Sequence, residues 1–259
     1  MNGMFRNVIL NAGAVVASAF FVGAAWAADV LVLGEIHDNP HHHRVQADLL
    51  ETAAPRAVVF EMLTQAEADA LRGVARDADA MRAATDGFHW GNIADYADVL
   101  AHSAVIVGAA LPRDAVREAF GAGAATVFGG GAEVYGLNSP LPADQQKVRE
   151  ALQFAAHCDA MPLEMMGGMV EAQRLRDAAF ARAVGEAVET YGTPVALITG
   201  NGHARMDWGV PSYLVRVRPD LVVESIGQGE GGMAPEGVFT SVLNDAPIPD
   251  RPDPCAAFR

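Results

Sequence analysis

Two copies of a Gly-x-x-His motif and a separate glutamate follow short apolar runs in the sequence. The motifs are Gly34-Glu35-Ile36-His37 and Gly200-Asn201-Gly202-His203, and Glu61 directly follows a third apolar run. Imidazole and carboxylate side chains that meet can transfer protons, or can bind a metal ion through nitrogen and oxygen. The residue types alone are compatible with both proton transfer and metal binding. We expect one polar site made of Glu35, His37, Glu61 and His203.

The apolar runs that precede these residues have the length and composition of buried strands. Helical patterns separate the runs, which lie at residues 30–33, 57–60, 104–108 and 194–200. Buried strands that alternate with helices predict an α/β fold, with a largely parallel sheet and helices on both faces. Such sheets bind ligands at the carboxyl ends of their strands, where the polar residues stand here. Further strands are expected at residues 213–215 and 221–223.

More than eighty residues separate the third run from the fourth, and they predict a small helical insertion subdomain at about residues 121–191. Residues 166–191 place apolar side chains at a spacing of three and four, as one face of a helix does. Asp177 lies on that apolar face. An unpaired carboxylate is costly there, so we expect Asp177 to pair with an arginine. The proline-rich tail at residues 246–259 is expected to be extended.

A helix is expected to begin directly after the first motif. Asn39 is a suitable N-cap, and Pro40 is a suitable first helical residue. The positive end of this helix would face the carboxyl edge of the sheet, where its backbone N–H groups suit an anion. Consecutive residues point about 100° apart on a helix, so His41, His42 and His43 cannot all bind one ion. We expect His42 or His43 to turn toward the site and His41 to face solvent.

The first 27 residues have the pattern of a cleaved signal peptide. Arg6 precedes an apolar run at residues 8–25, and Ala25-Trp26-Ala27 supplies the small residues of a cleavage site. The alternative is a retained membrane anchor. Cleavage would leave a periplasmic chain of 232 residues, 28–259, with a formal charge of −15. An oxidising compartment of that kind permits a disulfide between Cys158 and Cys255.

The composition excludes several classes of protein. The 259 residues include 32 acidic and 18 basic side chains, which gives a formal charge of −14, and 51% of them are hydrophobic. Nucleic-acid phosphates and anionic lipid surfaces attract proteins with an excess of Lys and Arg, so neither is an expected partner. The large apolar fraction also excludes a chain that is disordered as a whole.

Four blocks of sequence, in order along the chain, resemble the ChaN haem-binding proteins of the Tiki superfamily. The first block is Gly-Glu-Ile-His-Asp-Asn-Pro-x-His-His-x-x-Gln at residues 34–46. The others are Leu111-Pro112-Arg113, His157-Cys158 with Gln173-x-x-Arg176-Asp177 downstream, and the segment 200–211. Ala110 stands where the family pattern has Asn. The resemblance covers roughly residues 29–217.

The resemblance implies an exported protein of iron uptake that binds haem between two protomers and carries out no catalysis. It implies a homodimer in the loaded state, and an outer-membrane haem receptor system as a partner. A tyrosine is the expected iron ligand of the family; we place Tyr96, in the block Trp90-x5-Tyr96, first and Tyr135 second. Basic and histidine side chains hold the propionates in the family. The further candidate cofactor-binding residues are His37, His42, His43, Lys147, His157, Arg176 and His203.

A metal-dependent hydrolase is the alternative function. Proteins elsewhere in the superfamily use paired Gly-x-x-His motifs with strand-end glutamates to cleave peptides or esters. Glu35, His37, Glu61 and His203 would then bind a metal ion or activate water. The four family blocks favour haem binding, whereas the strand-end residues taken alone favour catalysis.

Overall fold

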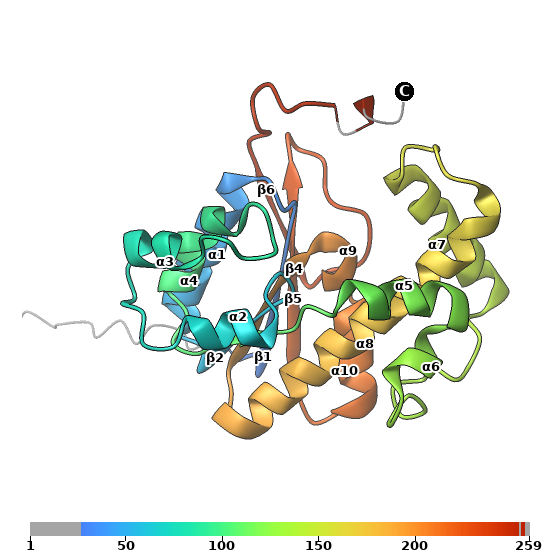
Figure 1. The fold of residues 1–259 in the computed structure, drawn as a ribbon, viewed down its shortest axis with the longest axis horizontal. Coiled ribbons are helices and arrows are strands. Elements are labelled where there is room, and N and C mark those ends of the chain that lie inside the picture. Colours follow the sequence, from blue (N-terminus) through green and yellow to red (C-terminus); the bar gives the residue numbers. More distant parts are fainter. Residues whose placement is uncertain (1–26, 254, 257–259) are drawn as a thin grey trace, which may run out of the picture.

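The apolar runs form one parallel sheet at the centre of the fold. The structure is a computed structural model that describes residues 27–253 and 255–256. Within those residues, six strands pair in parallel in the order β3-β2-β4-β1-β5-β6 (Figure 1). They are β1 (Val30–Glu35), β2 (Ala57–Phe60), β3 (Ile106–Gly108), β4 (Val195–Gly200), β5 (Val223–Glu230) and β6 (Ser241–Asp245). The predicted signal peptide lies outside the described residues, apart from Ala27.

The two middle strands, β1 and β4, are buried along their whole length. Helices cover both faces of the sheet there, which is why both strands read as continuous apolar runs. The register pairs Glu35 of β1 with Gly200 of β4, and Phe60 of β2 with Ile198 of β4. The carboxyl ends of β1, β2 and β4 therefore reach the same edge of the sheet side by side.

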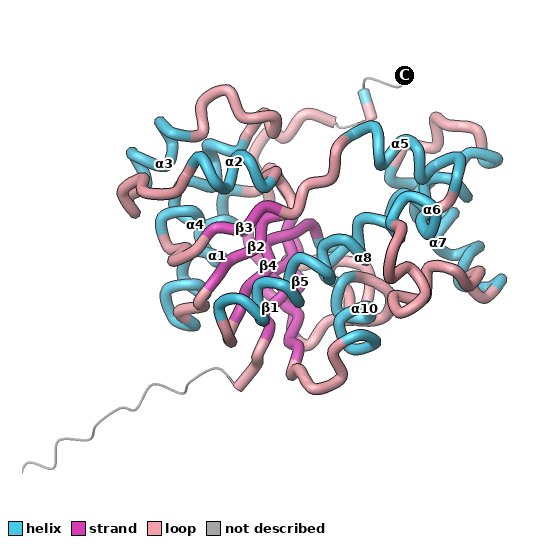
Figure 2. Tube along the Cα trace, turned by 60° about the horizontal axis from the view of Figure 1, so that its bottom comes forward, coloured by secondary structure: helices cyan, strands magenta, loops and turns pink. Residues whose placement is uncertain are grey.

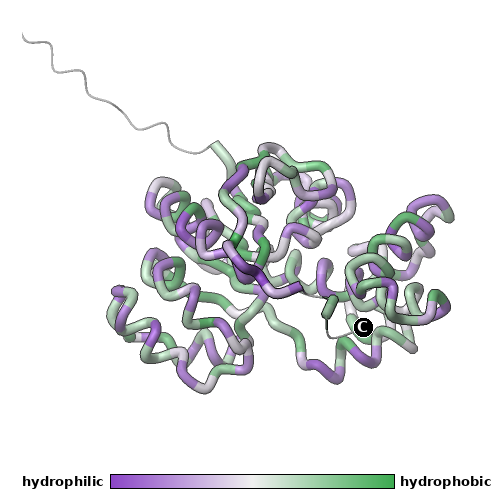
Figure 3. Tube along the Cα trace, turned by 90° about the horizontal axis from the view of Figure 1, so that it is seen from above, coloured by the Kyte–Doolittle hydropathy of each residue, from purple (hydrophilic) through white to green (hydrophobic). Residues whose placement is uncertain are grey.

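Helices flank the sheet on both sides (Figure 2). One face is covered by α1 (Pro40–Ala53), α2 (Gln65–Ala70), α3 (Ala78–Ala84), the short 3-10 turn Ile93–Tyr96 and α4 (Ala97–Ala101). The other face is covered by α8 (Met166–Tyr191) and α10 (Val210–Val217). Hydrophilic and hydrophobic residues alternate along the helices in Figure 3, as they do in amphipathic helices. The predicted α/β fold is confirmed. No helix in the described part of the chain has the length and apolar character that crossing a bilayer requires.

A further layer of helices packs on α8 and contains most of the predicted insertion. It consists of α5 (Arg113–Ala122), α6 (Ala124–Phe128) and α7 (Ala143–Ala156). The apolar face of α8 is buried from Met166 to Val188, whereas Tyr191 at its end is 37% exposed. Because α8 itself lies against β2 and β4, this helix also belongs to the layer that covers the sheet.

The strand expected at residues 213–215 is instead part of helix α10. Val210, Tyr213 and Leu214 are buried there while Val215 is exposed, which is the spacing of a helix and not of a strand. The last apolar run does become a strand, but β5 begins at Val223 and continues through polar residues. The edge strand β6 is largely exposed and carries no apolar run that predicts it from the sequence.

Helix α1 begins where the sequence predicts. Asn39 is its N-cap and accepts a hydrogen bond from the backbone N–H of His41 at 2.8 Å, and Pro40 is the first helical residue. His42 and His43 are buried, whereas the His41 side chain is 29% exposed. The helix therefore turns two of its three consecutive histidines into the protein, as the spacing predicts.

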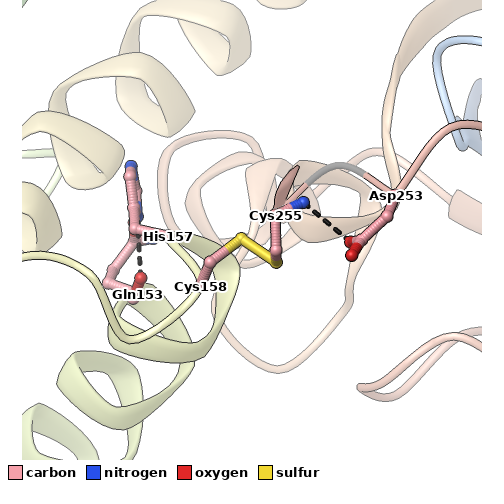
Figure 4. The surroundings of a disulfide bond; sticks show 5 residues. All are labelled: Gln153, His157, Cys158, Asp253 and Cys255. Carbon is pink, nitrogen blue, oxygen red and sulfur yellow. Dashed lines mark hydrogen bonds between the residues drawn. A yellow bond between two sulfur atoms is a disulfide. The ribbon is translucent and has the colours of Figure 1, made fainter. Parts of the chain in front are cut away.

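The C-terminal tail runs from β6 toward α7 across the top of the view in Figure 1. Residues 246–253 contain neither helix nor strand. Arg251 donates hydrogen bonds to Asp38, in the loop after β1, and to Glu230, at the end of β5, at 2.5–2.9 Å. Cys255 forms a disulfide with Cys158, just beyond the end of α7 (Figure 4). The tail thus connects the carboxyl edge of the sheet to the helical layer.

Candidate functional site

The two Gly-x-x-His motifs meet at the carboxyl edge of the sheet. A Cβ atom on Gly34 would stand 2.6 Å from Oδ1 of Asn201, and a Cβ atom on Gly200 would stand 2.9 Å from Nε2 of His37. The glycine of each motif therefore makes room for a side chain of the other motif. Asn201 also exchanges two hydrogen bonds with the backbone of Gln228 on β5, at 2.8 and 3.0 Å, so β5 helps to hold the second motif.

His37 lies between two carboxylates. Its Nδ1 is 2.7 Å from Oε1 of Glu35, and its Nε2 is 3.7 Å from Oε1 of Glu61. Burial by itself lowers the pKa of His37, but the hydrogen bond to Glu35 and the charges of Glu61 and Glu35 outweigh burial and raise the pKa above its ordinary value. The side chain remains 33% exposed and packs against Trp90. The fold thus brings three of the four expected strand-end residues into contact.

His203, the fourth of these residues, is paired with Asp177. It stands in the short helix α9 (Asn201–Ala204), and its Nδ1 is 2.6 Å from Oδ1 of Asp177 and 3.0 Å from Nε2 of Gln173. The prediction that Asp177 pairs with an arginine is wrong, because α8 passes the end of β4 here and meets a histidine. Burial raises the pKa of Asp177, while the charge of His203 opposes that rise. Glu35–His37 and Asp177–His203 are therefore two carboxylate–imidazole pairs at one edge of the sheet.

Glu61 is buried, and several groups stabilise its charged form. Its Oε2 accepts hydrogen bonds from the Thr199 hydroxyl and from the backbone N–H of Gly200, the latter at 2.9 Å, and its Oε1 is 3.4 Å from Nη2 of Arg176. Burial alone would raise the pKa of Glu61. The charge of His203, followed by the charges of His37 and Arg176, lowers that pKa to about 2. Glu61 is therefore an anion at neutral pH.

Tyr96, the first choice for an iron ligand, lies beneath these pairs and has no exposed surface. Its hydroxyl donates a hydrogen bond to Oε1 of Glu35 at 2.5 Å, and the ring of His43 packs on it with 4.0 Å between ring centroids. Burial, followed by the charge of Glu35, raises the pKa of Tyr96 far above its ordinary value, so the phenol stays protonated. The structure therefore places the Tyr96 hydroxyl in contact with Glu35 inside the protein, with no surface exposed to a ligand. His43 is equally enclosed, at 3% exposure.

His42 has a structural role in this arrangement. Its Nδ1 accepts a hydrogen bond from the backbone N–H of Ile36 at 3.0 Å, and its Nε2 lies 3.2 Å from the carbonyl oxygen of Gly229. Burial lowers the pKa of His42, which favours the neutral ring that these two bonds require. Both ring nitrogens are used by the backbone, so the structure also speaks against His42 as a cofactor-binding residue.

The remaining predicted cofactor residues lie on the helical layer. Tyr135 packs on Phe128, with 4.9 Å between ring centroids, and belongs to the core around the C-terminal half of α8. Lys147 is exposed on α7. His157 caps the C-terminus of α7, and its Nδ1 is 2.7 Å from the carbonyl oxygen of Gln153. The structure therefore separates Tyr135 from the strand-end residues. Lys147 and His157 both belong to α7 and its C-terminal cap.

A cavity of about 380 Å³ lies between α7, α8 and α9. Its walls are mostly apolar, and the lining residues are Arg149, Leu152, Gln153, Ala155, Ala156, Val170, Gln173, Asn201, Gly202, Arg205, Trp208 and Glu236. The guanidinium of Arg205 lies 3.5 Å from the centroid of the Trp208 ring, and that of Arg149 lies 5.0 Å from the same ring. We call this space the α7 cavity. It combines apolar surface with two cations.

No sequence motif marks Arg149 or Trp208 as a residue of this candidate site. Arg149 is three and seven residues before Leu152 and Ala156, so it shares their face of α7, and an arginine at such a position is the available signal. Trp208 follows the second motif by five residues and has no local pattern that marks it. Only the packing of α7 against α8 and α9 brings the two side chains together.

A second cavity, of about 210 Å³, lies between α8, α5 and the loops that precede the 3-10 turn Ile93–Tyr96 and follow β3. Two predicted residues, Glu61 and Arg176, line it together with His89, Trp90, Ala110, Leu111, Arg113, Val116 and Phe180. No sequence motif marks His89 either, and its Nδ1 lies 2.8 Å from Oε2 of Glu67. Residues beside the strand-end pairs thus line both cavities: Glu61 and Arg176 line this one, and Gln173 and Asn201 line the α7 cavity.

The sequence pattern of one protein family matches most of the chain. The family is described as haem-binding uptake, Tiki superfamily, ChaN, and it matches residues 21–214. Among solved structures, the chain is similar to one described as cofacial haem binding to ChaN of Campylobacter jejuni, with 18% sequence identity and a TM-score of 0.57 over 80% of this chain and 83% of that chain. It is also similar to the type III effector HopBA1, with 10% identity and a TM-score of 0.46 over 84% of this chain and 88% of that chain. No curated protein matches the chain.

These findings confirm two of the predictions. At 18% identity, the similarity to the Campylobacter protein shows the fold, and that fold is the predicted α/β arrangement. The family match confirms the resemblance seen in the four sequence blocks and supports haem as the cofactor. The chain belongs to the ChaN family of haem-binding uptake proteins within the Tiki superfamily.

Proposed function

We propose that this protein is an exported carrier of haem in haem and iron uptake, and that it holds haem at the α7 cavity without catalysing a reaction. Family membership supports the ligand class. The observation that carries the location is Arg149, a buried cation whose Nε and Nη1 have no hydrogen-bond partner among the described residues and which stands beside mostly apolar walls. Haem needs both features in its site, because its macrocycle is apolar and its two propionates are anionic.

Arg149 is suited to bind a carboxylate that enters the α7 cavity. Arg149 is 6% exposed, and its Nε and Nη1 make no hydrogen bond within the described part of the chain. Burial lowers the pKa of Arg149, but an arginine keeps its charge at neutral pH. Buried guanidinium N–H groups without an acceptor are unfavourable, and a propionate that accepts from Nε and Nη1 would remove that cost. Arg205, which Asp207 holds at 2.7 Å, supplies a second cation.

A homodimer in the loaded state is part of the proposal. The α7 cavity, at 380 Å³, lies near the lower end of the roughly 300–1,000 Å³ of pockets that enclose drug-sized ligands, and it is open to solvent. One protomer therefore covers only part of a macrocycle. Glu236 lines the cavity, and the exposed apolar side chains of Met233 and Val238 stand in the same loop. A second protomer on this side would cover both the exposed haem face and these side chains.

Export to the periplasm is supported by the sequence of residues 1–27 and by the Cys158–Cys255 disulfide. Disulfides persist in oxidising compartments such as the periplasm and are rare in the cytosol. An outer-membrane haem receptor system is the partner that such a carrier would serve. The acidic formal charge of the chain, −14, gives no general attraction for the anionic propionates, so local arginines must supply it.

Haemin titration tests the proposal. The chain that starts at Ala28 should bind haemin with a Soret shift, and binding should convert monomer to dimer in sedimentation experiments. Arg149→Gln should weaken haemin binding about 10- to 100-fold, because a hydrogen bond to a charged partner contributes roughly 1.5–3 kcal/mol. Arg117→Gln is the matched control, since Arg117 is an exposed arginine on α5 that pairs with Asp114 and does not line the α7 cavity among the described residues.

Two results would contradict this proposal. Absence of any spectral change on titration would remove haem as the ligand. Equal haemin affinity in Arg149→Gln, Arg117→Gln and the unchanged protein would remove the α7 cavity as the site.

A hydrolase is the second candidate function, and the two carboxylate–imidazole pairs are the observation that favours it. Glu35 and Asp177 each orient a histidine, at 2.7 and 2.6 Å, with the anionic Glu61 beside His37. Oriented imidazoles of this kind activate water or bind metal ions in enzymes. Within the described residues, no three histidine, cysteine or carboxylate side chains are arranged to hold a metal ion. Ester and peptide hydrolysis with and without added Zn²⁺ or Mn²⁺, compared between the unchanged protein and His37→Ala, tests this candidate; activity that His37→Ala abolishes would support it.

A further inference from the structure

The second cavity, which we call the α5 cavity, differs from the α7 cavity in size. Its volume is about 210 Å³, below the roughly 300–1,000 Å³ of pockets that enclose drug-sized ligands. A water molecule takes about 30 Å³ in the liquid, so the α5 cavity has room for about seven waters or for one small organic molecule. A porphyrin is too large for this space. A ligand of the α5 cavity is therefore different from the haem proposed for the α7 cavity.

Two arginines on different helices line the α5 cavity. Arg113 is the first residue of α5, and Arg176 belongs to α8. Arg113 is exposed and has neither an ion-pair nor a hydrogen-bond partner among the described residues. Arg176 contacts Glu61 through Nη2 at 3.4 Å, and its side chain is 33% exposed. A planar guanidinium binds a carboxylate through two parallel hydrogen bonds, so both arginines have donors to offer to an anion.

The carboxylate of Glu61 also lines the α5 cavity, but other groups already compensate its charge. Its Oε2 accepts hydrogen bonds from the Thr199 hydroxyl and the backbone N–H of Gly200, and its Oε1 faces Arg176. Arg113 takes no part in this arrangement. Within the residues that the structure describes, the lining therefore contains a cation that no carboxylate neutralises.

Two further kinds of hydrogen-bond donor border the α5 cavity. Trp90 lines it, and its Nε1–H is buried without a hydrogen-bond partner in the described part of the chain. The first turn of α5 has no side-chain cap, because its N-cap is Pro112. Asp114 in that turn is 91% exposed and pairs with Arg117. Uncapped N–H groups at the start of a helix carry a partial positive charge and suit an anion.

Most of the remaining lining is apolar. It consists of the rings of Trp90 and Phe180 and the side chains of Ala110, Leu111 and Val116. Apolar walls offer no hydrogen bonds to a fully hydrated inorganic ion, whereas an organic acid gains from the removal of its apolar part from water. The lining thus combines donors for one anionic group with walls for a small apolar body.

We propose that the α5 cavity binds a small organic monocarboxylate. Its carboxylate would accept hydrogen bonds from Arg113 and Arg176 at the start of α5, and its apolar body would lie against the apolar walls. Trp90 packs on His37, with 5.2 Å between ring centroids, so the acid would lie beside the Glu35–His37 pair. This site goes beyond haem binding and does not depend on it.

Isothermal titration calorimetry with sodium benzoate and sodium butyrate tests the proposal on the chain that starts at Ala28. The unchanged protein should bind at least one of these acids. Benzyl alcohol, which has the ring of benzoate but no charge, should bind at least about tenfold more weakly, and Arg113→Gln should weaken acid binding about tenfold, because each change removes hydrogen bonds between charged groups.

Two more variants locate the acid. Ala110→Leu fills part of the α5 cavity without changing its charge, and it should weaken binding of the acid. Arg117→Gln is the matched control for Arg113→Gln: Arg117 stands one turn later on α5, is exposed and lies outside the lining of the α5 cavity among the described residues. That variant should bind the acid as the unchanged protein does. Urea unfolding midpoints without ligand show whether a loss of binding comes from a loss of folding.

Three outcomes would overturn the proposal. The first is no binding of either acid by the unchanged protein. The second is equal acid affinity in Arg113→Gln, Ala110→Leu and the unchanged protein, which would place the acid elsewhere. The third is tighter binding of inorganic phosphate than of both acids, which would indicate a site for inorganic anions. Because no haem is used, failure of haemin binding and failure of acid binding are separate results.

Discussion

Removal of the Cys158–Cys255 disulfide is expected to lower the free energy of unfolding by about 4–5 kcal/mol. The two cysteines are 97 residues apart. In the chain-entropy model, a cross-link that closes a loop of that length restricts the unfolded chain by about 4.7 kcal/mol at 25 °C. The folded tail would keep its contacts through Arg251, so the main effect of removal is on the unfolded state. Urea unfolding of the unchanged protein and of Cys158→Ser/Cys255→Ser measures the difference.

Reductant provides the control for this experiment. Dithiothreitol should lower the urea midpoint of the unchanged protein toward that of the double variant and leave the double variant unaffected. A second comparison tests export: protein produced with residues 1–27 should be recovered from the periplasm with both thiols blocked to alkylation, whereas protein that starts at Ala28 in the cytoplasm should be alkylated at both. A double variant as stable as the unchanged protein would contradict the predicted stabilisation, and free thiols in the periplasmic protein would contradict the pairing.

Glu61→Gln is expected to destabilise the fold by about 3–5 kcal/mol at neutral pH. Glutamine keeps the shape and an acceptor oxygen, but it removes the charge that faces Arg176 at 3.4 Å and His37 at 3.7 Å. Breaking a buried ion pair by removing one partner leaves the other charge uncompensated, and this accounts for the size of the effect. Chemical denaturation at pH 7 measures the loss. Glu118→Gln, at an exposed glutamate of α5, is the matched control and should change stability by less than about 0.5 kcal/mol.

The cost of Glu61→Gln should depend on pH in a defined direction. The pKa of Glu61 is about 2 in the folded protein, whereas the ordinary pKa of a glutamate, taken for the unfolded chain, is 4.5. Because the folded pKa is the lower one, the stabilisation by the charged carboxylate is complete above pH 4.5 and is lost as the pH falls from 4.5 through about 2. The difference between the unchanged protein and Glu61→Gln should therefore shrink over that interval. A difference that stays constant from pH 7 to pH 2, or one below 1 kcal/mol at pH 7, would contradict the role of Glu61 as a buried anion.

Local sequence patterns predicted most of the elements that position the site. The runs at 30–33, 57–60 and 194–200 became strands because a strand buried on both faces must be apolar throughout, and that property is visible in consecutive residues. The start of α1 was predicted because N-capping by Asn39 depends only on residues within one turn. Residues 213–215 were misassigned because three apolar residues do not distinguish a strand from the buried side of a helix.

The strand-end residues were identified from sequence, but their partners were not. A residue directly after a parallel strand reaches the carboxyl edge of the sheet wherever that strand lies, so Glu35, His37 and Glu61 were placed without knowledge of strand order. Asp177 meets His203 only because α8 crosses the end of β4. No spacing along the chain encodes that crossing, and for this reason the arginine partner was the wrong expectation.

The sequence alone determined the α/β class, the polar edge of the sheet and the ChaN family, because apolar periodicity, capping residues and motif spacing are all properties of neighbouring residues. The tertiary structure decided which side chains are accessible. It enclosed Tyr96 under Glu35 and, within the residues it describes, left Nε and Nη1 of Arg149 without a hydrogen-bond partner beside a mostly apolar cavity. Burial and pairing depend on which helices pack over a residue, and those contacts join segments far apart in the chain, so local sequence patterns do not encode them.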